Sequence, residues 1–351
     1  MGGGGAERQL AYLSRELVNQ GYEVHVAYIY DGVNTTRLQE SGSVAHKLSV
    51  RSNHDPRLFF QLAAIMRKVK PDIVQTWLTQ MDIVGGSIAK TMGIPLVVSE
   101  RCSSLCYAGT WKDKFRIFIG GKASCIVANS ESGRNYWVSN GLYPDFVKTI
   151  RNGVPFEEIN GTTLADLVTY GVHPDTEVIV FAGRYSAQKN LQNLMQALKK
   201  VLNNRPKANA FLFGDGPLKN DLLATQKQFG FGNRLQIMGF SSDLWGIFKR
   251  ANVFVSVSHC EGVPNTVLEA VVCRCPVVLS DIPEHREFLS DDAAYFVSAQ
   301  SPNAIADQIL KVLSDTNEAK LKTQRAYREI SNWSVEFVTQ EYIDLYRNII
   351  G

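Results

Sequence analysis

Short apolar segments rich in β-branched residues alternate with segments of helical periodicity along most of this 351-residue chain, and few folds accommodate that alternation. Helical spacing is clearest from Ala6 to Leu17 and from Leu191 to Leu198. Strands are expected at 22–30, 45–50, 72–77, 95–100 and 125–130, and then at 178–184, 210–214, 235–239, 253–258, 276–280 and 294–297. The pattern predicts an α/β fold with two doubly wound parallel sheets, whose ligands bind outside the carboxyl ends of the strands.

The segment Glu261-Gly-Val-Pro-Asn-Thr-Val-Leu-Glu269 places two carboxylates eight positions apart around a turn that opens a helix. Gly262 permits a sharp exit from the preceding strand, and Pro264 suits the first turn of the helix. The amides of Asn265 and Thr266 would then face outward as an anion site suited to a diphosphate, with the two glutamates bonding sugar and ribose hydroxyls. An acidic turn that complements the helix dipole would explain one glutamate, but not the residues between the two.

Two cations follow the strand expected at 178–184. Arg184 and Lys189 only donate hydrogen bonds, and the loop after a parallel strand is where a diphosphate would lie. Breaking a sugar–phosphate bond requires that the charge on the departing diphosphate be neutralised, which these side chains could do. The alternative is that Arg184 makes a surface ion pair and Lys189 is a solvated loop residue.

Several ordered motifs of this chain resemble those of the retaining glycosyltransferases of family 4. The matching segments are Gly3-Gly-Gly-Ala-Glu-Arg8, Phe181-Ala-Gly-Arg184 with Lys189-Asn190, Phe213-Gly-Asp-Gly-Pro217, Met238-Gly-Phe240 and the segment from Glu261 to Glu269. The resemblance implies the GT-B architecture of two facing Rossmann-like domains, a nucleotide-sugar donor and retention of anomeric configuration. It also implies that the diphosphate itself takes the acceptor's proton, so that no dedicated base is required.

In GT-B proteins the last helix crosses back to the first domain, and the helical spacing after Val335 is similar. The segment Asn152-Gly-Val-Pro155 is the expected link between the domains. We therefore expect an N-terminal acceptor-side domain of residues 1–152 plus 334–351, and a C-terminal nucleotide-sugar-binding domain of residues 153–333.

The resemblance also suggests roles for individual residues. Catalytic roles are expected for Arg184, Lys189 and Glu261, and donor binding for Gly4, Gly5, Gly183, Met238, Gly262, Val263, Pro264, Asn265, Thr266 and Glu269. Acceptor candidates are Trp77, Gln80 and Asp82, which follow a first-domain strand, and Arg101. Arg101 stands where many family members carry a histidine, and it could bond a sugar hydroxyl or an acceptor phosphate but not act as a base. A buried tryptophan and a local Glu100–Arg101 ion pair are the structural alternatives.

Positive charge is concentrated in the first half of the chain. Residues 1–150 hold 17 Lys and Arg against 12 Asp and Glu, which leaves a net charge of −2 for the remainder. Basic residues alternate with aromatic ones over residues 111–122, and a second basic group, Arg67, Lys68 and Lys70, ends a helix. Peripheral association with an anionic membrane, or an anionic lipid-linked acceptor, would suit this face, as would an ordinary solvated helix surface.

The glycines at the start of the chain lack the strand that ordinarily precedes a phosphate-binding loop, because only Met1 stands before them. The first domain is therefore expected to lack its first, central strand. The gene is expected to encode about eight to twelve further apolar residues upstream, enough for a typical strand.

Several classes of protein are disfavoured by composition. No apolar run reaches membrane-spanning length and no secretory signal is seen, which predicts a cytoplasmic protein, placed at most at the inner face of the membrane. No metal site is implied, because acidic pairs at strand ends and zinc-ligand spacings are absent from the sequence. No cofactor is implied, and the near-neutral net charge of +3 disfavours nucleic acid as a partner.

The leading functional hypothesis is a retaining glycosyltransferase that moves a hexose or N-acetylhexosamine from a nucleoside-diphosphate sugar to a polysaccharide or lipid-linked acceptor. A UDP-sugar is favoured on family frequency only. A nucleotide-sugar epimerase of GT-B fold and a non-catalytic sugar-binding relative are the alternatives. The two glutamates and the two cations weigh against the last of these.

Overall fold

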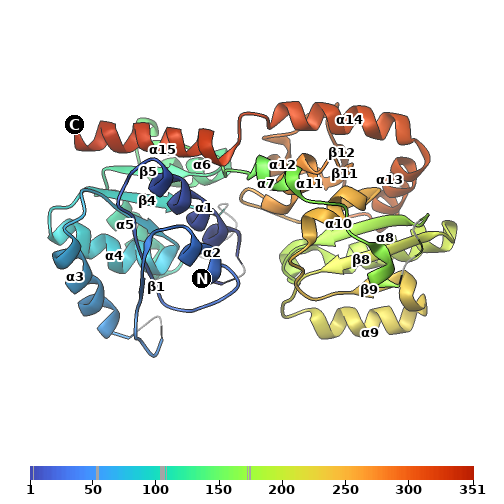
Figure 1. Ribbon diagram of the computed structural model, residues 1–351, viewed down its shortest axis with the longest axis horizontal. Helices are drawn as coiled ribbons and strands as arrows, with labels where there is room; N and C mark the ends of the chain where they lie inside the picture. Colours follow the sequence, from blue (N-terminus) through green and yellow to red (C-terminus); the bar gives the residue numbers. More distant parts are fainter. Residues whose placement is uncertain (3, 53–54, 103–106, 108, 172, 174) are drawn as a thin grey trace. The chain divides into compact units, whose positions relative to one another are not determined.

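The chain divides into two compact units in the computed structural model, which describes all residues except 3, 53–54, 103–106, 108, 172 and 174. The first unit comprises Met1–Pro155 and Trp333–Gly351, and the second comprises Phe156–Asn332 (Figure 1). The sequence suggested boundaries at 152 and 334.

Every strand pair of the first unit is parallel, and helices separate most of its strands. Its strands are β1 (His25–Tyr28), β2 (Val44–Lys47), β3 (Val74–Trp77), β4 (Leu96–Glu100), β5 (Cys125–Ala128) and β6 (Val147–Thr149). Its helices are α1 (Gly5–Asn19), α2 (Thr35–Glu40), α3 (Arg57–Val69), α4 (Thr79–Thr91), α5 (Trp111–Gly120), α6 (Glu131–Ser139) and α15 (Val335–Ile350). Strand β6 was not predicted from the sequence, because its three residues are too few to show a period of two.

Alternate residues of β4 and β5 face opposite layers of helices, as the pleat of a strand requires. Val97 and Val127 pack with α1 and α15. Val98 and Ala128 pack with α4, α5 and α6 on the other face. Both faces are thus apolar, which is why these strands appear in the sequence as continuous hydrophobic runs.

The strands of the first unit form two separate sheets, β1-β2 and β3-β4-β5-β6. In the part of the chain that the structure describes, β1 pairs only with β2, and β3 only with β4. A cavity of about 430 Å³ lies between the two sheets and is lined by Val26 and Tyr28 from β1 and by Val74 and Thr76 from β3. The sheet is therefore interrupted where the sequence analysis expected a missing central strand.

The second unit holds a single parallel sheet among its described residues, in the order β12-β11-β10-β7-β8-β9. Its strands are β7 (Glu177–Ala182), β8 (Ala208–Phe213), β9 (Leu235–Ile237), β10 (Val253–Ser256), β11 (Val277–Ser280) and β12 (Tyr295–Val297). Its helices are α7 (Phe156–Gly161), α8 (Leu191–Asn204), α9 (Lys219–Phe229), α10 (Leu244–Arg250), α11 (Asn265–Val272), α12 (Pro283–Arg286), α13 (Pro302–Ser314) and α14 (Thr316–Glu329).

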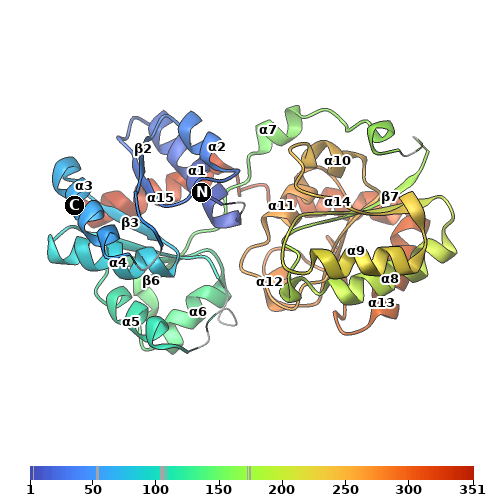
Figure 2. The same cartoon turned by 90° about the horizontal axis from the view of Figure 1, so that it is seen from below.

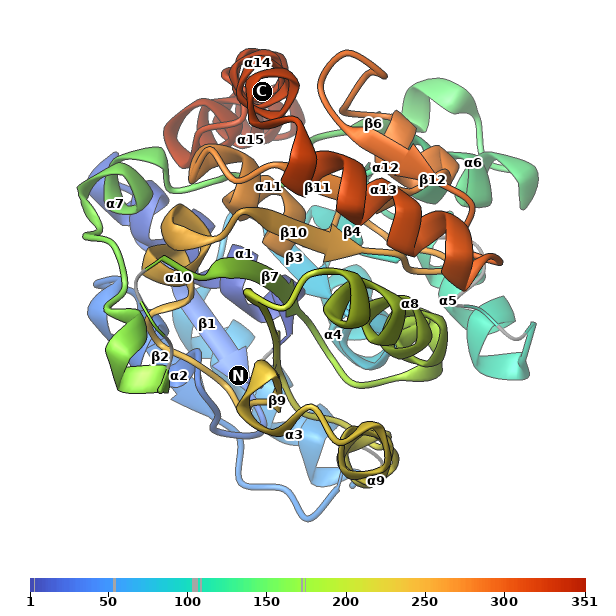
Figure 3. The same ribbon diagram turned by 90° about the vertical axis from the view of Figure 1, so that its right-hand side faces the viewer.

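Helices cover both faces of this sheet (Figures 2 and 3). Leu194 and Leu198 of α8 pack with Ile305 and Ile309 of α13 over one face. On the other face Phe248 of α10 meets Phe254 of β10 edge to face, with 5.0 Å between ring centroids. The chain runs outward from β7 to β8 and β9 on one side, and from β10 to β11 and β12 on the other. The strand order therefore reverses between β7 and β10, and such a switch point is where doubly wound sheets bind ligands.

The gap between β1 and β3 predicts that this unit accepts one more strand. An apolar extension of about eight to twelve residues placed before Met1 should pair with both strand edges and fill the cavity, because unpaired backbone groups and an apolar void both lower stability. We expect the melting temperature to rise by about 4 °C or more, measured by calorimetry. A Gly/Ser extension of equal length is the control, and equal melting temperatures for the two extensions would contradict the prediction.

Candidate functional site

The expected catalytic residues of the second unit lie on both sides of the switch point between β7 and β10. Arg184 and Lys189 are in the loop that follows β7, and Glu261 is in the loop that follows β10. Because the two strands are adjacent and parallel, their carboxyl ends lie at the same edge of the sheet. Residues separated by more than 70 positions in the sequence are thereby brought together.

Lys189 and Glu261 form an ion pair with 2.5 Å between Nζ and Oε1. The side chain of Glu261 is buried and that of Lys189 nearly so. Two hydrogen bonds fix the loops that carry them: His259 N donates to Gln188 O at 2.9 Å, and Gln188 Nε2 donates to Cys260 O at 2.8 Å. The pair is therefore held in place by hydrogen bonds between the two loops and not only by its own charges.

Asn190 holds the start of α8 directly after Lys189. Its Nδ2 donates to Val257 O at 3.1 Å and to Ala299 O at 2.8 Å, so the side chain joins three loops at this edge of the sheet. Its backbone is left-handed, with φ of 54°, a conformation that asparagine tolerates better than most residues. The Lys-Asn sequence thus supplies both a cation and the anchor that positions it.

Helix α11 begins at Asn265, with Pro264 as its N-cap. Pro264 therefore lies one position earlier than the first helical turn in which the sequence analysis placed it. The amides of Asn265 and Thr266 are the first two of the helix, for which a helix has no internal acceptor. Glu269, one turn further on, is buried. Gly262 and Val263, partly exposed, complete the turn between the strand and the helix.

The loops after β7 and β8 approach each other closely at Gly183 and Gly214. Arg184, the next residue after Gly183, is exposed. Gly214 has φ of 146°, and a Cβ there would lie 1.9 Å from the carbonyl oxygen of Gly183, so that no other residue fits. This contact explains the first glycine of Phe213-Gly-Asp-Gly-Pro217. The second, Gly216, has φ of 155°, and a Cβ there would lie 2.5 Å from the carbonyl oxygen of Tyr185.

The main chain of Met238 is engaged within the unit. Its N–H donates to Leu212 O at 2.8 Å, and its carbonyl accepts from the hydroxyl of Tyr185 at 2.6 Å. Phe240, further along the same loop, is exposed. The resemblance suggests that Met238 contacts the nucleotide base. Because the main chain of Met238 is already hydrogen-bonded, Phe240 at the exposed end of the loop is better placed for that contact.

His285 belongs to the same edge of the sheet, and the sequence analysis missed it. It is fully buried in α12, and its Nδ1 lies 2.9 Å from Ser280 O at the end of β11. Burial lowers the pKa of His285, the nearby charge of Glu261 opposes that shift, and Lys189 reinforces it. A lone histidine between Glu284 and Arg286 carries no sequence pattern that would distinguish it from a surface residue.

Two acceptor candidates of the first unit contact each other. The guanidinium of Arg101 stacks on the ring of Trp77, 3.9 Å from its centroid. It also donates to Asn152 Oδ1 at 3.0 Å and to the hydroxyl of Tyr342 in α15 at 2.5 Å. Arg101 thus joins the end of β4 to the C-terminal helix. Of the two structural alternatives, Trp77 is indeed buried in the core, whereas a Glu100–Arg101 ion pair is not among the described contacts.

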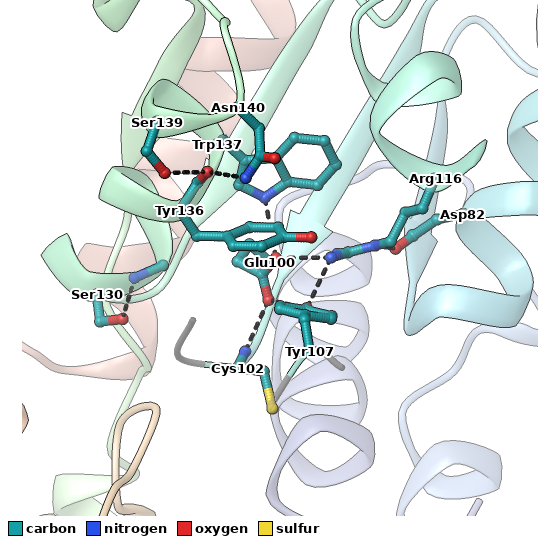
Figure 4. Close-up of polar contacts among 11 residues, drawn as sticks. Asp82, Glu100, Cys102, Tyr107, Arg116, Ser130, Tyr136, Trp137, Ser139 and Asn140 are labelled. Carbon is teal, nitrogen blue, oxygen red and sulfur yellow. Dashed lines mark hydrogen bonds and ion pairs between the residues drawn. The ribbon is translucent and has the colours of Figure 1, made fainter. Parts of the chain in front are cut away.

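Asp82 is not available to an acceptor, contrary to the expectation from sequence. It is 1% exposed, and its carboxylate accepts from Arg116 Nε at 2.6 Å (Figure 4). Arg116 is equally buried and also donates to Glu100 at 2.8 Å, so it is not part of a basic surface either. Burial by itself would lower the pKa of Arg116, but the charges of Asp82 and Glu100 outweigh it and raise the pKa. This buried ion triad ties α4 and α5 to the end of β4.

Gln80 and Trp77 lie on either side of Leu78, which has φ of 73° and ψ of 148°. Residues other than glycine rarely adopt this backbone region, and such strain clusters at functional sites.

Gly4 and Gly5 form the N-terminus of α1 in the first unit and are exposed. The two glycines and the acceptor candidates thus belong to a different unit from the cluster at the switch point.

The burial of His285 predicts a pH dependence of stability. Its pKa is lower in the folded than in the unfolded protein, so the folded state binds fewer protons and loses stability as the pH falls below about 6.5. The loss approaches about 1.4 kcal/mol per pH unit until the folded pKa is reached. His285→Asn should flatten this slope between about pH 7.5 and 5.5 in urea unfolding, and the exposed control His173→Asn should not. Equal slopes in wild type and His285→Asn would contradict the prediction.

Two sequence families match the chain in succession. The model described as "Glycosyltransferase Family 4" matches residues 3–158, and the model described as "Glycosyl transferases group 1" matches residues 168–329. The chain is 28% identical over 246 residues to the UDP-Gal:alpha-D-GlcNAc-diphosphoundecaprenol alpha-1,3-galactosyltransferase of Escherichia coli, covering 65% of this chain and 62% of that protein. It is 23% identical to the N-acetylgalactosamine-N,N'-diacetylbacillosaminyl-diphospho-undecaprenol 4-alpha-N-acetylgalactosaminyltransferase of Campylobacter jejuni, covering 93% of this chain and 90% of that protein.

Solved structures agree on the fold. Anabaena HepE in complex with UDP-glucose superposes with a TM-score of 0.87 at 19% identity, covering 98% of this chain and 96% of HepE. A sucrose-phosphate synthase from Thermosynechococcus elongatus superposes with a TM-score of 0.82 at 16% identity, covering 99% of this chain and 94% of that one. The predicted GT-B fold is therefore confirmed, and the chain belongs to the glycosyltransferases of family 4.

Proposed function

We propose that this glycosyltransferase transfers a hexose or N-acetylhexosamine from a UDP-sugar, with retention of configuration, to a polysaccharide or lipid-linked acceptor. The observation that carries the proposal is the convergence of Arg184, Lys189, Glu261 and the first amides of α11 on the switch point between β7 and β10. The two named relatives, one of which uses UDP-Gal and both of which act on diphospho-undecaprenol-linked sugars, support the donor and the acceptor class.

The ion pair between Lys189 and Glu261 suggests how the donor is received. When a diphosphate enters, the Lys189 ammonium exchanges a carboxylate partner for phosphate oxygens, and Glu261 becomes available to accept from a sugar hydroxyl. Arg184, exposed beside it, adds a second cation, and the N-terminal amides of α11 add a fixed partial charge. Glu269 is the candidate for bonding the ribose hydroxyls.

These groups would stabilise the charge that develops as the diphosphate departs, when the sugar acquires oxocarbenium character. The bond between the anomeric carbon and the phosphate oxygen breaks, and the acceptor oxygen bonds to the anomeric carbon from the same face. A departing diphosphate oxygen takes the proton of that acceptor hydroxyl. No protein base is needed in this scheme, and the cations serve without a metal ion. His285, buried and with a lowered pKa, holds the loop after β11 and is not assigned a proton-transfer role.

Acceptor binding is assigned to the first unit, at Gln80 and Arg101. Trp77 is buried in the core of this unit and carries the Arg101 guanidinium on its ring, so its proposed part is to position Arg101, whose cation suits an acceptor phosphate. Of the helices in the described ranges, none combines the length and apolarity needed to span a bilayer. The proposal places the enzyme in the cytoplasm. It would meet its lipid-linked acceptor there, at the inner face of an anionic membrane.

A nucleotide-sugar epimerase and a non-catalytic sugar-binding relative are the other functions considered from the sequence. Incubation with labelled nucleotide sugars, with and without a membrane extract as the source of acceptor, separates the three. The proposed function requires labelled product only when the extract is present. Product formation without extract would indicate an epimerase, and binding without turnover would indicate a non-catalytic relative.

Donor binding provides the first prediction from this proposal. UDP at about one hundred times its Kd should stabilise the protein by about 2.7 kcal/mol, whereas uridine, which lacks phosphates, should give little stabilisation. Glu269→Ala should weaken UDP binding by about 1.5–3 kcal/mol, because charge-assisted bonds to the ribose are lost. The exposed Glu157→Ala in the same unit is the control. Thermal shift measurements that give equal UDP affinity for Glu269→Ala and the control would contradict this role.

Turnover provides the second prediction. Arg184→Ala and Lys189→Ala should each lower kcat about 100-fold or more, because stabilisation of the leaving group is lost. The control is Lys200→Ala, which removes a lysine that pairs with Asp307 at the surface of the same unit. Lys189→Ala also leaves the buried carboxylate of Glu261 unpaired, which lowers stability. The double variant Lys189→Met with Glu261→Gln removes both charges, so it should be more stable than Lys189→Ala and still be inactive. Normal turnover in Arg184→Ala or Lys189→Ala would remove that residue from the site.

A further inference from the structure

His285 of α12 is a fully buried histidine at the edge of the sheet where the donor cluster lies. Its ring packs edge to face with Phe288, with 6.3 Å between ring centroids. Its Nδ1 lies 2.9 Å from Ser280 O. Because a carbonyl oxygen can only accept a hydrogen bond, Nδ1 carries the proton of the neutral ring and Nε2 carries a lone pair.

The Nε2 atom of His285 has no hydrogen-bond partner among the residues that the structure describes. Buried polar atoms without a partner are rare in native proteins, and each one calls for an explanation. Nε2 is also the atom that would receive a second proton and turn the ring into a cation. The ring is therefore held by one nitrogen and left open to protonation at the other.

Strands β10 and β11 bring His285 close to the ion pair of Lys189 and Glu261. The two strands are parallel neighbours, and Ser280 Oγ donates to Ser258 O at 2.7 Å where they end. Glu261 follows Ser258 by three positions. Burial lowers the pKa of His285 most, Lys189 lowers it further, and Glu261 raises it. His285 is thus neutral while Lys189 and Glu261 are paired with each other.

Other charged groups lie on or beside α12. Arg286 pairs with Asp281 at 2.7 Å and with Asp291 at 2.6 Å, and these side chains are partly or fully exposed. Glu284, next to His285 in the helix, is buried. None of these groups contacts the donor in the proposed function. The charge around the ring therefore changes through the ion pair when the donor binds.

We propose that His285 takes up a proton from solvent when the donor binds, and then serves as the countercharge that positions Glu261. The inference rests on the proposed function, in which Lys189 leaves Glu261 for the diphosphate. That exchange removes the cation paired with Glu261 and brings the negative charge of the diphosphate close by, and both changes favour the imidazolium. His285 is thus a positioning residue that keeps Glu261 ionised to accept from a sugar hydroxyl, and its proton takes no part in sugar transfer.

Donor affinity should therefore depend on pH through His285. Since binding is linked to proton uptake, the Kd should increase as the pH rises from about 6 to about 8, by at most about tenfold per pH unit. UDP is unsuitable as the probe, because its terminal phosphate itself titrates near about pH 6. Both phosphates of a UDP-sugar stay ionised, so the probe is the tightest binder among UDP-glucose, UDP-galactose and UDP-N-acetylglucosamine.

Isothermal titration calorimetry in buffers of different ionisation enthalpy counts the protons taken up for each donor bound. Wild type at about pH 6.5 should take up a measurable fraction of one proton. His285→Asn, whose amide can still donate to Ser280 O, should take up none, and its Kd should vary less with pH. Glu261→Gln should also take up none, because the carboxylate that stabilises the cation is absent. This second variant retains His285, so the test holds even if His285→Asn does not fold.

His259→Asn is the matched control, since His259 is an exposed histidine two residues before Glu261. It should take up protons as wild type does. Binding by wild type without proton uptake would overturn the inference and leave the proposed function standing. Uptake that persists in His285→Asn, or that disappears in His259→Asn, would overturn it as well. A wild type that binds neither UDP nor any of the three UDP-sugars would instead count against the donor site, and the inference would fall with it.

Discussion

The second unit is organised around the adjacency of two parallel strands, β7 and β10, at the place where the strand order reverses. Because the chain leaves these strands in opposite directions, their loops diverge and leave room for a ligand at the carboxyl edge. Lys189 from one loop and Glu261 from the other form the ion pair across that point. The side chains of Gln188 and Asn190 donate hydrogen bonds from the loop after β7 to carbonyl oxygens of the segment after β10. The pairing of the two strands and these bonds together fix the positions of both charges.

Charge is used differently in the first unit. Arg116 lies in the core with Asp82 and Glu100, and breaking such a buried set by removing one partner costs about 3–5 kcal/mol. The hydroxyl of Tyr107, the indole of Trp137 and the amide of Cys102 also donate to Glu100, so a single carboxylate organises the end of β4 and the chain on either side of it. The same arginine fixes α5 to the core, while Trp111, Phe115 and Phe118 on its other face are exposed.

Much of the fold and of the donor cluster could be predicted from the sequence because the signals are local. The strands have continuous apolar runs, and the segment from Glu261 to Glu269 combines a turn, a helix start and two acids within nine residues. Asp82 and Arg116 were misplaced because a buried ion pair looks like two surface charges until the tertiary partners are known. His285 was missed for the related reason that its importance depends on burial beside Glu261, 24 positions away in the sequence.

A structure of this chain with UDP bound tests the central claim most directly. The account predicts that the diphosphate lies at the carboxyl ends of β7 and β10, within hydrogen-bond distance of Arg184, Lys189 and the first amides of α11. Lys189 should then have exchanged Glu261 for phosphate oxygens, with the ribose near Glu269. A diphosphate bound elsewhere, with the pair of Lys189 and Glu261 intact, would contradict the assignment of this site.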